Sequence, residues 1–165
     1  MIVAMSDTDK PYPEQMELDE ALHLNLVVRR LAHRYRQLAA HHLGTIGLQP
    51  GQEALLLVLG ERKQCSQAEL AAALDVEPPT VSSMVTKLEA AGTLSRTPSS
   101  ADRRQAVVRL TPAGRRLLPK LRQANIALAE EATASLGADL GKTIAAIERL
   151  ANAVPRATDP RAVRP

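Results

Sequence analysis

The apolar residues in the first third of the chain recur with the period of a helix. Between residues 17 and 43, leucine, valine, alanine and tyrosine side chains return about every 3.6 positions, which is typical of a long amphipathic helix. Gly44 and Gly47 follow directly and indicate its end. A second helix is predicted from Pro50, a residue that suits a first helical position, to about Gly60.

The pattern then changes twice along the chain. Two short helices are predicted over residues 67–74 and 80–91. The next two runs, LSRT at 94–97 and AVVRL at 106–110, are short and of β type. Because a polar stretch separates them, we expect a hairpin with a long tip.

A helix start follows the hairpin at once. Thr111 can cap a helix from the N-cap position, and Pro112 fits its first turn. The pattern predicts a long helix from there to about residue 136, bent near Pro119, and a last helix over residues 138–154.

Two adjacent prolines, Pro78 and Pro79, separate the two short helices. Proline in a helix interior costs about 3 kcal/mol. The first backbone N–H groups of a helix have no intrahelical partner, so a proline loses nothing there. The prolines therefore mark the start of a second helix after a tight turn, as in a helix-turn-helix. That helix turns its polar residues outward: Thr80, Ser82, Ser83, Thr86 and Lys87.

Short hydroxyl side chains near a helix N-terminus can approach phosphates and base edges closely. The same residues would also suit an ordinary solvated helix. The predicted hairpin decides between these interpretations, because it carries four arginines against a single acid, Asp102. The arginines are Arg96, Arg103, Arg104 and Arg109. A basic loop beside a candidate recognition helix is typical of a wing on double-stranded DNA.

Composition narrows the choice of partners. The 165 residues include two tyrosines and neither phenylalanine nor tryptophan, which disfavours an aromatic platform for single-stranded nucleic acid. The formal charge of +3 permits a nucleic-acid partner without demonstrating one. The longest apolar run, residues 54–59, is too short to span a bilayer, and the N-terminus lacks the pattern of a signal peptide. We expect a cytoplasmic protein with no membrane partner.

The segment from Ser66 to Arg115, SQAELAAALDVEPPTVSSMVTKLEAAGTLSRTPSSADRRQAVVRLTPAGR, resembles the MarR family of winged helix-turn-helix transcriptional regulators. LQPGQEALLLVL and the flanking long helices extend the resemblance to about residues 19–154. Its most specific part is Asp-x-Arg in the wing, followed by Leu-Thr-x-x-Gly. The resemblance implies a mainly α fold with a small β-hairpin wing: a winged helix-turn-helix flanked by a helical dimerisation region, of the α+β class.

The resemblance also implies how the chain meets DNA. Asp102 and Arg104 match the family's wing pair, in which the aspartate orients the arginine that enters the minor groove. There are two departures from the family pattern. Glu77 stands where serine often caps the recognition helix, which would lower affinity for DNA. Asp75 stands where the turn often has glycine, and aspartate tolerates a left-handed turn. The expected DNA contacts are Gln67, Thr80, Ser82, Ser83, Thr86, Lys87, Asp102, Arg103 and Arg104.

The expected organisation places a DNA-binding lobe inside a dimerisation region. We expect a flexible arm over residues 1–16, a helical dimerisation region over 17–48 and 112–154, a winged helix-turn-helix lobe over 49–111, and a disordered tail over 155–165. The first and last helices are too apolar for the lobe alone to cover, so a homodimer is expected to bind a pseudo-palindromic operator. The proposed interface residues are Leu18, Leu22, Leu26, Ile144, Ile147 and Leu150.

Many members of the family release DNA when a small aromatic or anionic ligand binds between the dimer helices and the lobe. Candidate effector residues are Arg96, which matches a ligand-contacting position in some relatives, and His41. A phosphate contact or a structural contact is the favoured alternative for Arg96. Cys65 is the single cysteine, which excludes a disulfide within the chain. It precedes the helix-turn-helix, where a short strand packs, so a small buried thiol is favoured over a redox sensor.

Metal and enzyme chemistry find little support. All four histidines lie on the first predicted helix, whereas a zinc site needs ligands that converge, usually from several elements. The chain shows no phosphate-binding glycine loop and no recognisable nucleophile pattern, so neither an enzyme nor a cofactor is expected. The prediction is a homodimeric DNA-binding regulator, most simply a repressor released by an effector. The alternatives are a constitutive DNA binder and a winged-helix module that binds protein.

Overall fold

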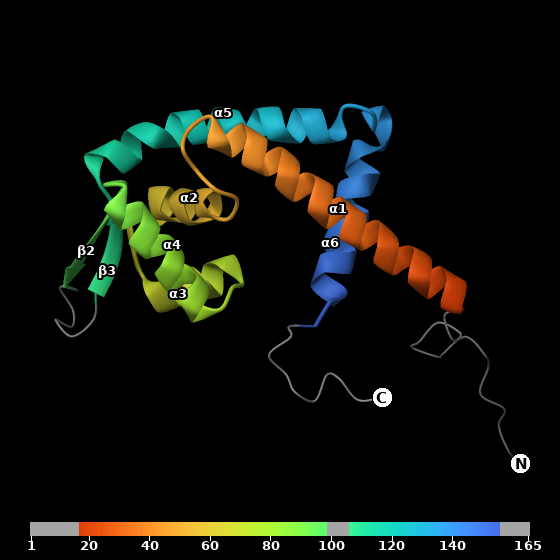
Figure 1. The fold of residues 1–165 in the computed structure, drawn as a ribbon, viewed down its shortest axis with the longest axis horizontal. Helices are drawn as coiled ribbons and strands as arrows, with labels where there is room; N and C mark the ends of the chain where they lie inside the picture. Colours follow the sequence, from red (N-terminus) through yellow and green to blue (C-terminus); the bar gives the residue numbers. More distant parts are fainter. Residues whose placement is uncertain (1–16, 99–105, 156–165) are drawn as a thin grey trace, which may run out of the picture.

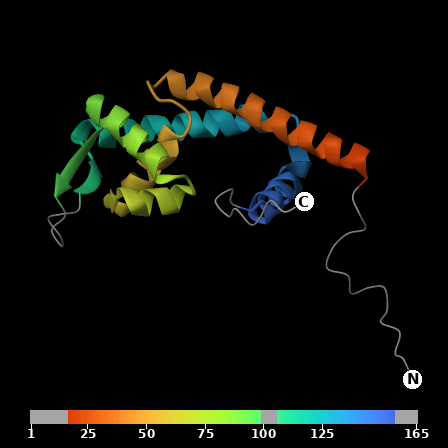
Figure 2. The ribbon, with the colours of Figure 1, turned by 60° about the horizontal axis from the view of Figure 1, so that its bottom comes forward.

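The structure is a computed structural model that describes residues 17–98 and 106–155. Two long helices, α1 (Leu18–Gly44) and α5 (Pro112–Thr133), pack against each other. Helix α6 (Leu140–Ala153) follows α5 and runs back past α1 (Figure 1). The other elements form a separate lobe beside the beginning of α5, and a second view keeps this separation (Figure 2). The fold is mainly α with a small antiparallel sheet, as predicted.

The lobe has the element order of a winged helix-turn-helix. The two predicted short helices are present, and the predicted β-hairpin follows them. The tip of the hairpin, residues 99–105, lies outside the described residues. The bounds of the lobe elements are α2 (Gln52–Arg62), β1 (Gln64–Ser66), α3 (Gln67–Leu74), α4 (Pro78–Ala90), β2 (Leu94–Pro98) and β3 (Ala106–Leu110).

The helix-turn-helix follows from strong local signals. The Ser66 hydroxyl accepts from the backbone N–H of Glu69 at 3.2 Å, and the Glu69 carboxylate accepts from the backbone N–H of Ser66 at 2.7 Å. This capping box begins α3, and the hydrogen bonds from Ser66 lower the pKa of Glu69. Asp75 ends α3 in the left-handed conformation, with φ of 53°, as expected. Helix α4 begins at Pro78, where proline loses no hydrogen bond.

The sheet joins the wing to the helix-turn-helix. Strand β3 lies in the middle and pairs antiparallel with β1 and β2. Val108 is opposite Cys65 on one side and opposite Arg96 on the other. The short strand anticipated around Cys65 is therefore present, and its pairing with β3 ties the start of α3 to the wing.

The core belongs to the lobe and to its junction with α5. Its largest fully buried side chains come from α2, α3, α4, β3 and α5, together with Leu43 at the end of α1. Helix α1 contributes only Ala39 and Leu43 as buried residues, and no residue of α6 is buried. The lobe thus closes its own core while most of α1 and α6 stays uncovered.

The second helix starts later than the sequence indicated. Pro50 precedes it, and α2 runs from Gln52 to Arg62. Gly51 takes a left-handed conformation with φ of 96°, and the Gln52 side chain accepts from the backbone N–H of Gln49 at 2.9 Å. This local turn uses the residues that the pattern assigned to the helix. At the other end of the molecule, a short 3₁₀ turn (Gly137–Asp139) delays α6 to Leu140.

The Leu-Thr-x-x-Gly motif is the joint between the wing and α5. The Thr111 hydroxyl donates to the carbonyl of Gly92 at 2.7 Å and accepts from the backbone N–H of Gly114 at 3.1 Å. The Thr111 backbone N–H also donates to the carbonyl of Thr93 at 3.0 Å. Gly114 is buried, and a side chain there would collide with that same carbonyl. The motif thus holds the start of α5 against the start of β2. Further along, Pro119 lies inside α5, and the helix bends in this region (Figure 1).

No helix among the described residues is both long enough and apolar enough to span a membrane.

Gly114→Ala is expected to lower the free energy of unfolding by about 2–3 kcal/mol, because the added methyl group meets a backbone carbonyl that cannot move freely. Denaturant unfolding measures the change. Gly141→Ala is the matched control. Nothing lies within 4 Å of a Cβ placed at Gly141 in α6, so alanine should stabilise that helix by up to about 1 kcal/mol. Equal unfolding midpoints for the two variants would contradict this account of the motif.

Candidate nucleic-acid interface

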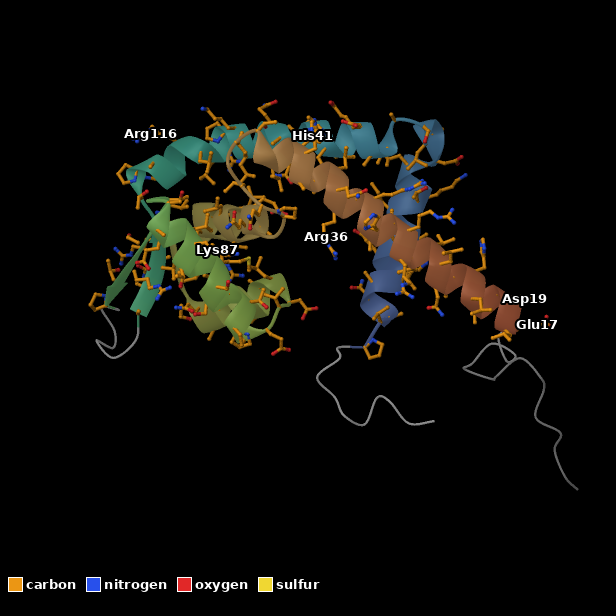
Figure 3. The ribbon with its side chains drawn as sticks, viewed as in Figure 1. Glu17, Asp19, Arg36, His41, Lys87 and Arg116 are labelled. Atoms are coloured by element: carbon orange, nitrogen blue, oxygen red, sulfur yellow. The ribbon has the colours of Figure 1, made fainter. Side chains whose placement is uncertain are left out.

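Helix α4 presents one apolar face to the lobe and one polar face to solvent. Val81, Val85 and Leu88 are buried in the core, and Met84 is partly buried against it. The outward residues are those expected from the sequence: Thr80, Ser83, Thr86 and Lys87 are exposed, and Ser82 is half-buried. Figure 3 shows Lys87 on this helix. A rigid lobe therefore displays a row of short hydroxyl side chains and one ammonium group.

The polar residues of α4 divide into two rows. Thr80, Ser83 and Lys87 face the beginning of α2 and, together with Met84, line a groove of about 610 Å³ there. Thr86 faces the other way, toward β2, as its hydrogen bond with that strand shows. The residues of the first row are exposed, whereas Thr86 contacts β2.

Arg96 on β2 makes the contact between the wing and α4. Its guanidinium donates to the Thr86 hydroxyl at 2.8 Å and forms an ion pair with Glu89, with Nε 3.2 Å from Oε2. The other carboxylate oxygen of Glu89 accepts from the backbone N–H of Arg96 at 3.2 Å. The Glu89 carboxylate therefore holds both the main chain and the side chain of one wing residue.

The remaining predicted DNA contacts are Gln67, which the structure describes, and three wing residues, which lie outside the described residues. Gln67 is the first residue of α3 and is half-buried. Asp102, Arg103 and Arg104 fall between β2 and β3, outside the described residues, so their contacts remain predictions. Glu77 is the N-cap residue of α4, and its side chain makes no capping hydrogen bond. It leaves a negative charge at the end of α4 where a phosphate would be favoured.

Among the described residues, the large exposed apolar side chains lie on α1, on α5, and on or just after α6. Leu18, Leu22 and Leu26 on α1 are 72%, 57% and 53% exposed. On α6, Ile144, Ile147 and Leu150 are also exposed. The predicted interface residues thus lie on α1 and α6, which stand apart from the core of the lobe (Figure 2). An exposed apolar face of this kind is typical of a protein–protein contact.

Comparison with known proteins identifies this arrangement. Residues 48–106 match the MarR family. A curated relative, a putative transcriptional regulatory protein for the hcr operon of Thauera aromatica, is 32% identical over 117 residues, which are 70% of each chain. The chain belongs to the MarR family.

Two solved structures extend the likeness over most of the chain. A probable transcriptional regulator from Pseudomonas aeruginosa is 30% identical, with a TM-score of 0.72 over 84% of this chain and all of that one. The repressor CouR, solved on a 23-mer DNA duplex, is 26% identical, with a TM-score of 0.70 over 84% of this chain and 98% of that one. This MarR-family chain is a DNA-binding transcriptional regulator, a class that is distinct from the enzymes.

The structure does not bring the two predicted effector residues together. Arg96 lies on β2, and His41 lies near the end of α1, with α4 between these elements (Figure 1). His41 is exposed, and its ring meets that of His42 edge to face, with centroids 5.6 Å apart. The Arg96 guanidinium contacts Glu89 and Thr86 within the chain; the sequence favours a phosphate or structural contact for this residue.

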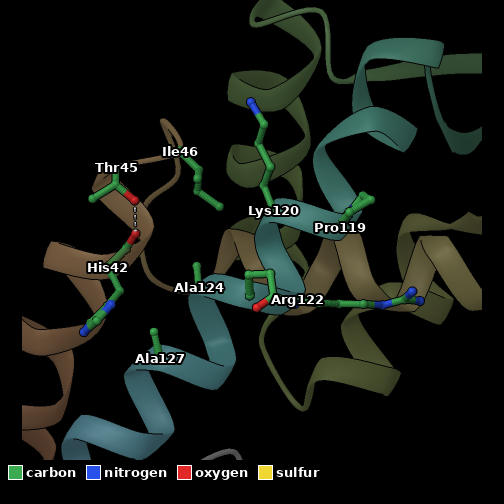
Figure 4. A pocket seen from close by; sticks show the side chains of 9 residues that line it. His42, Thr45, Ile46, Pro119, Lys120, Arg122, Ala124 and Ala127 are labelled. Atoms are coloured by element: carbon green, nitrogen blue, oxygen red, sulfur yellow. Dashed lines mark hydrogen bonds between the residues drawn. The ribbon is translucent and has the colours of Figure 1, made fainter.

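His42, rather than His41, lines a cleft of this MarR-family chain. The cleft has a volume of about 690 Å³ and lies between the end of α1, the following loop and α5. The Nε2 atom of His42 is 2.8 Å from Oε2 of Glu131 on α5. Ile46 and Lys120 border the cleft, while the Arg122 side chain extends away from His42 (Figure 4). The apolar walls and the basic rim of the cleft suit an organic anion.

Two of these contacts could not be predicted from the sequence. The partners His42 and Glu131 are 89 positions apart, and nothing local links them. Glu89 sits three residues after Thr86 on α4, so helical spacing places the two on one side. Arg96 contacts both residues because the turn into β2 brings it alongside α4.

Cys65 is buried in the structure, as favoured from the sequence. Burial is the main cause that raises the pKa of its thiol, and the charge of Glu69 adds to the effect, while nearby Arg62 opposes both. The thiol is therefore held in its protonated, less nucleophilic form.

Cys65 is expected to react with a thiol reagent at pH 8 only when the lobe unfolds, and rapidly in denaturant. The folded state keeps its proton where the unfolded chain begins to lose it, so stability should fall as the pH rises above about 8.5. Cys65→Ala should remove this part of the pH dependence. The measurements are labelling kinetics and unfolding at two pH values. Fast labelling of the folded protein would contradict a buried thiol.

Proposed function

We propose that this MarR-family chain is a homodimeric repressor that binds a pseudo-palindromic operator and is released by a small organic anion. The observation that carries the proposal is the open apolar face of α1 and α6 beside a lobe with a closed core. A second copy of the chain would cover that face and pair two α4 helices about a two-fold axis.

The proposed DNA contact follows from the dimer. Two recognition helices related by a two-fold axis read half-sites about one helical turn apart, roughly 10 bp centre to centre. On each half-site, Thr80, Ser83 and Thr86 would meet the major groove, and Lys87 would meet a flanking phosphate. The wing residues Asp102 and Arg104 would address the adjacent minor groove, as the family pattern implies. The DNA-bound relative CouR, named a repressor, supports repression as the direction of control.

The proposed effector site is the cleft at His42. A ligand carboxylate there would compete with Glu131 for the imidazole, while Ile46 and Ala124 would pack on an apolar ring. Because α1 and α5 form the two walls, an occupant would alter their packing and with it the spacing of the two lobes. Titration of operator binding with a panel of aromatic acids tests this. Unchanged affinity throughout would favour a constitutive DNA binder.

Salt dependence separates a DNA regulator from a winged-helix module that binds protein. Several phosphate contacts should make the affinity fall steeply and linearly on a log–log plot against salt. Selection of bound sites from a random duplex pool supplies the operator for this measurement. A chain that enriches no duplex would overturn the proposal.

Substitution of a leucine or isoleucine on the open face is expected to produce monomers. Ile147→Glu places a charge at the centre of the proposed interface, and sedimentation should show a folded monomer where the parent protein is a dimer. Arg149→Glu is the matched control. It adds a glutamate to the opposite face of α6, two residues away, and should leave the dimer intact. A parent protein that is monomeric at micromolar concentration would refute the dimer.

Arg104→Ala is expected to weaken operator binding more than Lys87→Ala. An arginine in a narrow minor groove gains from its concentrated negative potential, so its loss should cost about 1–3 kcal/mol and flatten any preference for flanking A·T pairs. Loss of Lys87 should weaken all sequences similarly and lower the salt slope by about one. Fluorescence anisotropy on the operator and on a G·C-flanked variant measures both. Equal binding of both duplexes by Arg104→Ala and the parent protein would remove the wing from the DNA contact.

A further inference from the structure

The contact between Arg96 and Thr86 has a direct chemical consequence. A guanidinium carries donors and no acceptor. In the 2.8 Å hydrogen bond from Arg96 Nη2 to Thr86 Oγ1, the hydroxyl oxygen must therefore be the acceptor. The hydroxyl hydrogen of Thr86 then points elsewhere. Thr86 is exposed on α4, so this hydrogen is available to a group outside the protein.

Glu89 prevents Arg96 from leaving this position. Its carboxylate pairs with Nε of Arg96 at 3.2 Å and accepts from the Arg96 backbone N–H, also at 3.2 Å. The guanidinium is thus held along its length, between the strand that carries it and the helix that it contacts. Because Thr86 and Glu89 lie on the same side of α4, the helix and β2 present Thr86 in one orientation.

We propose that Arg96 is a positioning residue that directs the Thr86 hydroxyl to donate to a base, and so sets the preference at one base pair of each half-site. The inference rests on the proposed reading of DNA by α4. In the major groove, purine N7, guanine O6 and thymine O4 accept hydrogen bonds, whereas the amino group of cytosine donates. The guanidinium occupies one of the two lone pairs of Thr86 Oγ1 and places a positive charge beside the other. The hydroxyl therefore favours base acceptors over the cytosine amino group. A threonine whose hydroxyl rotated freely would accept either kind of partner.

A merely structural Arg96 would behave differently. It would tie the wing to α4, and its loss would lower affinity for every operator to the same extent. A Thr86 hydroxyl that met a phosphate would also give a uniform loss, since phosphate contacts carry no sequence information directly. The distinguishing quantity is therefore the change in preference at single base pairs, and overall affinity alone does not suffice.

The test measures the affinity of the full-length protein for the selected operator and for all its single base-pair variants. Thr86→Val keeps the shape of the side chain and leaves the pair of Arg96 and Glu89 in place. We expect it to weaken the preferred operator about three- to tenfold and to flatten the preference at one base pair per half-site. Thr86→Ser retains the hydroxyl and should preserve that preference.

Arg96→Gln tests the positioning role. A glutamine amide can accept as well as donate, so the Thr86 hydroxyl regains its freedom, and the same base pair should lose its preference. The double variant, Thr86→Val with Arg96→Gln, should lose no further preference at that pair, because both changes act on one hydrogen bond. Thermal unfolding of each variant shows whether the lobe is intact, and Thr86→Val carries the test if Arg96→Gln is unstable.

Arg109→Gln is the matched control for charge. Arg109 lies on the neighbouring strand β3 and borders Arg62, Lys63 and Gln64 at the other edge of the sheet. It should leave the base-pair profile unchanged. A uniform loss in Thr86→Val, a profile unchanged by Arg96→Gln, or effects of the two substitutions that multiply would overturn the inference. If the parent protein enriches no duplex, the proposed DNA-binding function itself is wrong. That result is distinct from a failure of the inference about Arg96.

Discussion

The burial of one face of α4 is the interaction on which the rest of the molecule depends. Val81, Val85 and Leu88 fix the rotation of the helix about its own axis, because they fill the core of the lobe. Once that rotation is set, the hydroxyl side chains must face outward, and Thr86 must face β2. The α3–α4 turn and the capping box at Ser66 serve this placement. A recognition surface of short side chains works only if the helix beneath it cannot turn.

Helices α1 and α6 contribute little to the closed core of the lobe. Helices α1 and α6 bury few of their apolar side chains within their own chain and leave most of them exposed. In the proposed dimer, this division would leave the fold of the DNA-binding lobe undisturbed. The contact of α1 with α5, through Leu43 and through His42 with Glu131, is the mechanical link between the two parts. In the proposed dimer, a ligand that changed this contact would alter the spacing of the two lobes.

Two sets of contacts hold the strands of the wing. One is made by Thr111 and Gly114, and the other by Arg96. The first fixes where the sheet meets α5, through hydrogen bonds to Gly92 and Thr93. The second fixes how β2 stands against α4. Together they hold β2 against α4 and against the start of α5. Arg96, considered from the sequence as an effector residue, is already occupied by Glu89 and Thr86 in the folded chain.

The sequence by itself determined the elements, because helical period, proline position and capping residues act within a few neighbours. The long first helix, the start of α4 at Pro78 and the hairpin were all predictable in this way. The outward set on α4 was predictable as well, since one helix has one buried face. Tertiary structure decided which side chains meet across the fold. Three features arise between different elements: the pairing of Arg96 with Glu89, the position of His42 at the cleft, and the close approach of the Thr93 carbonyl to Gly114. Their geometry depends on how whole elements pack, which no local pattern records.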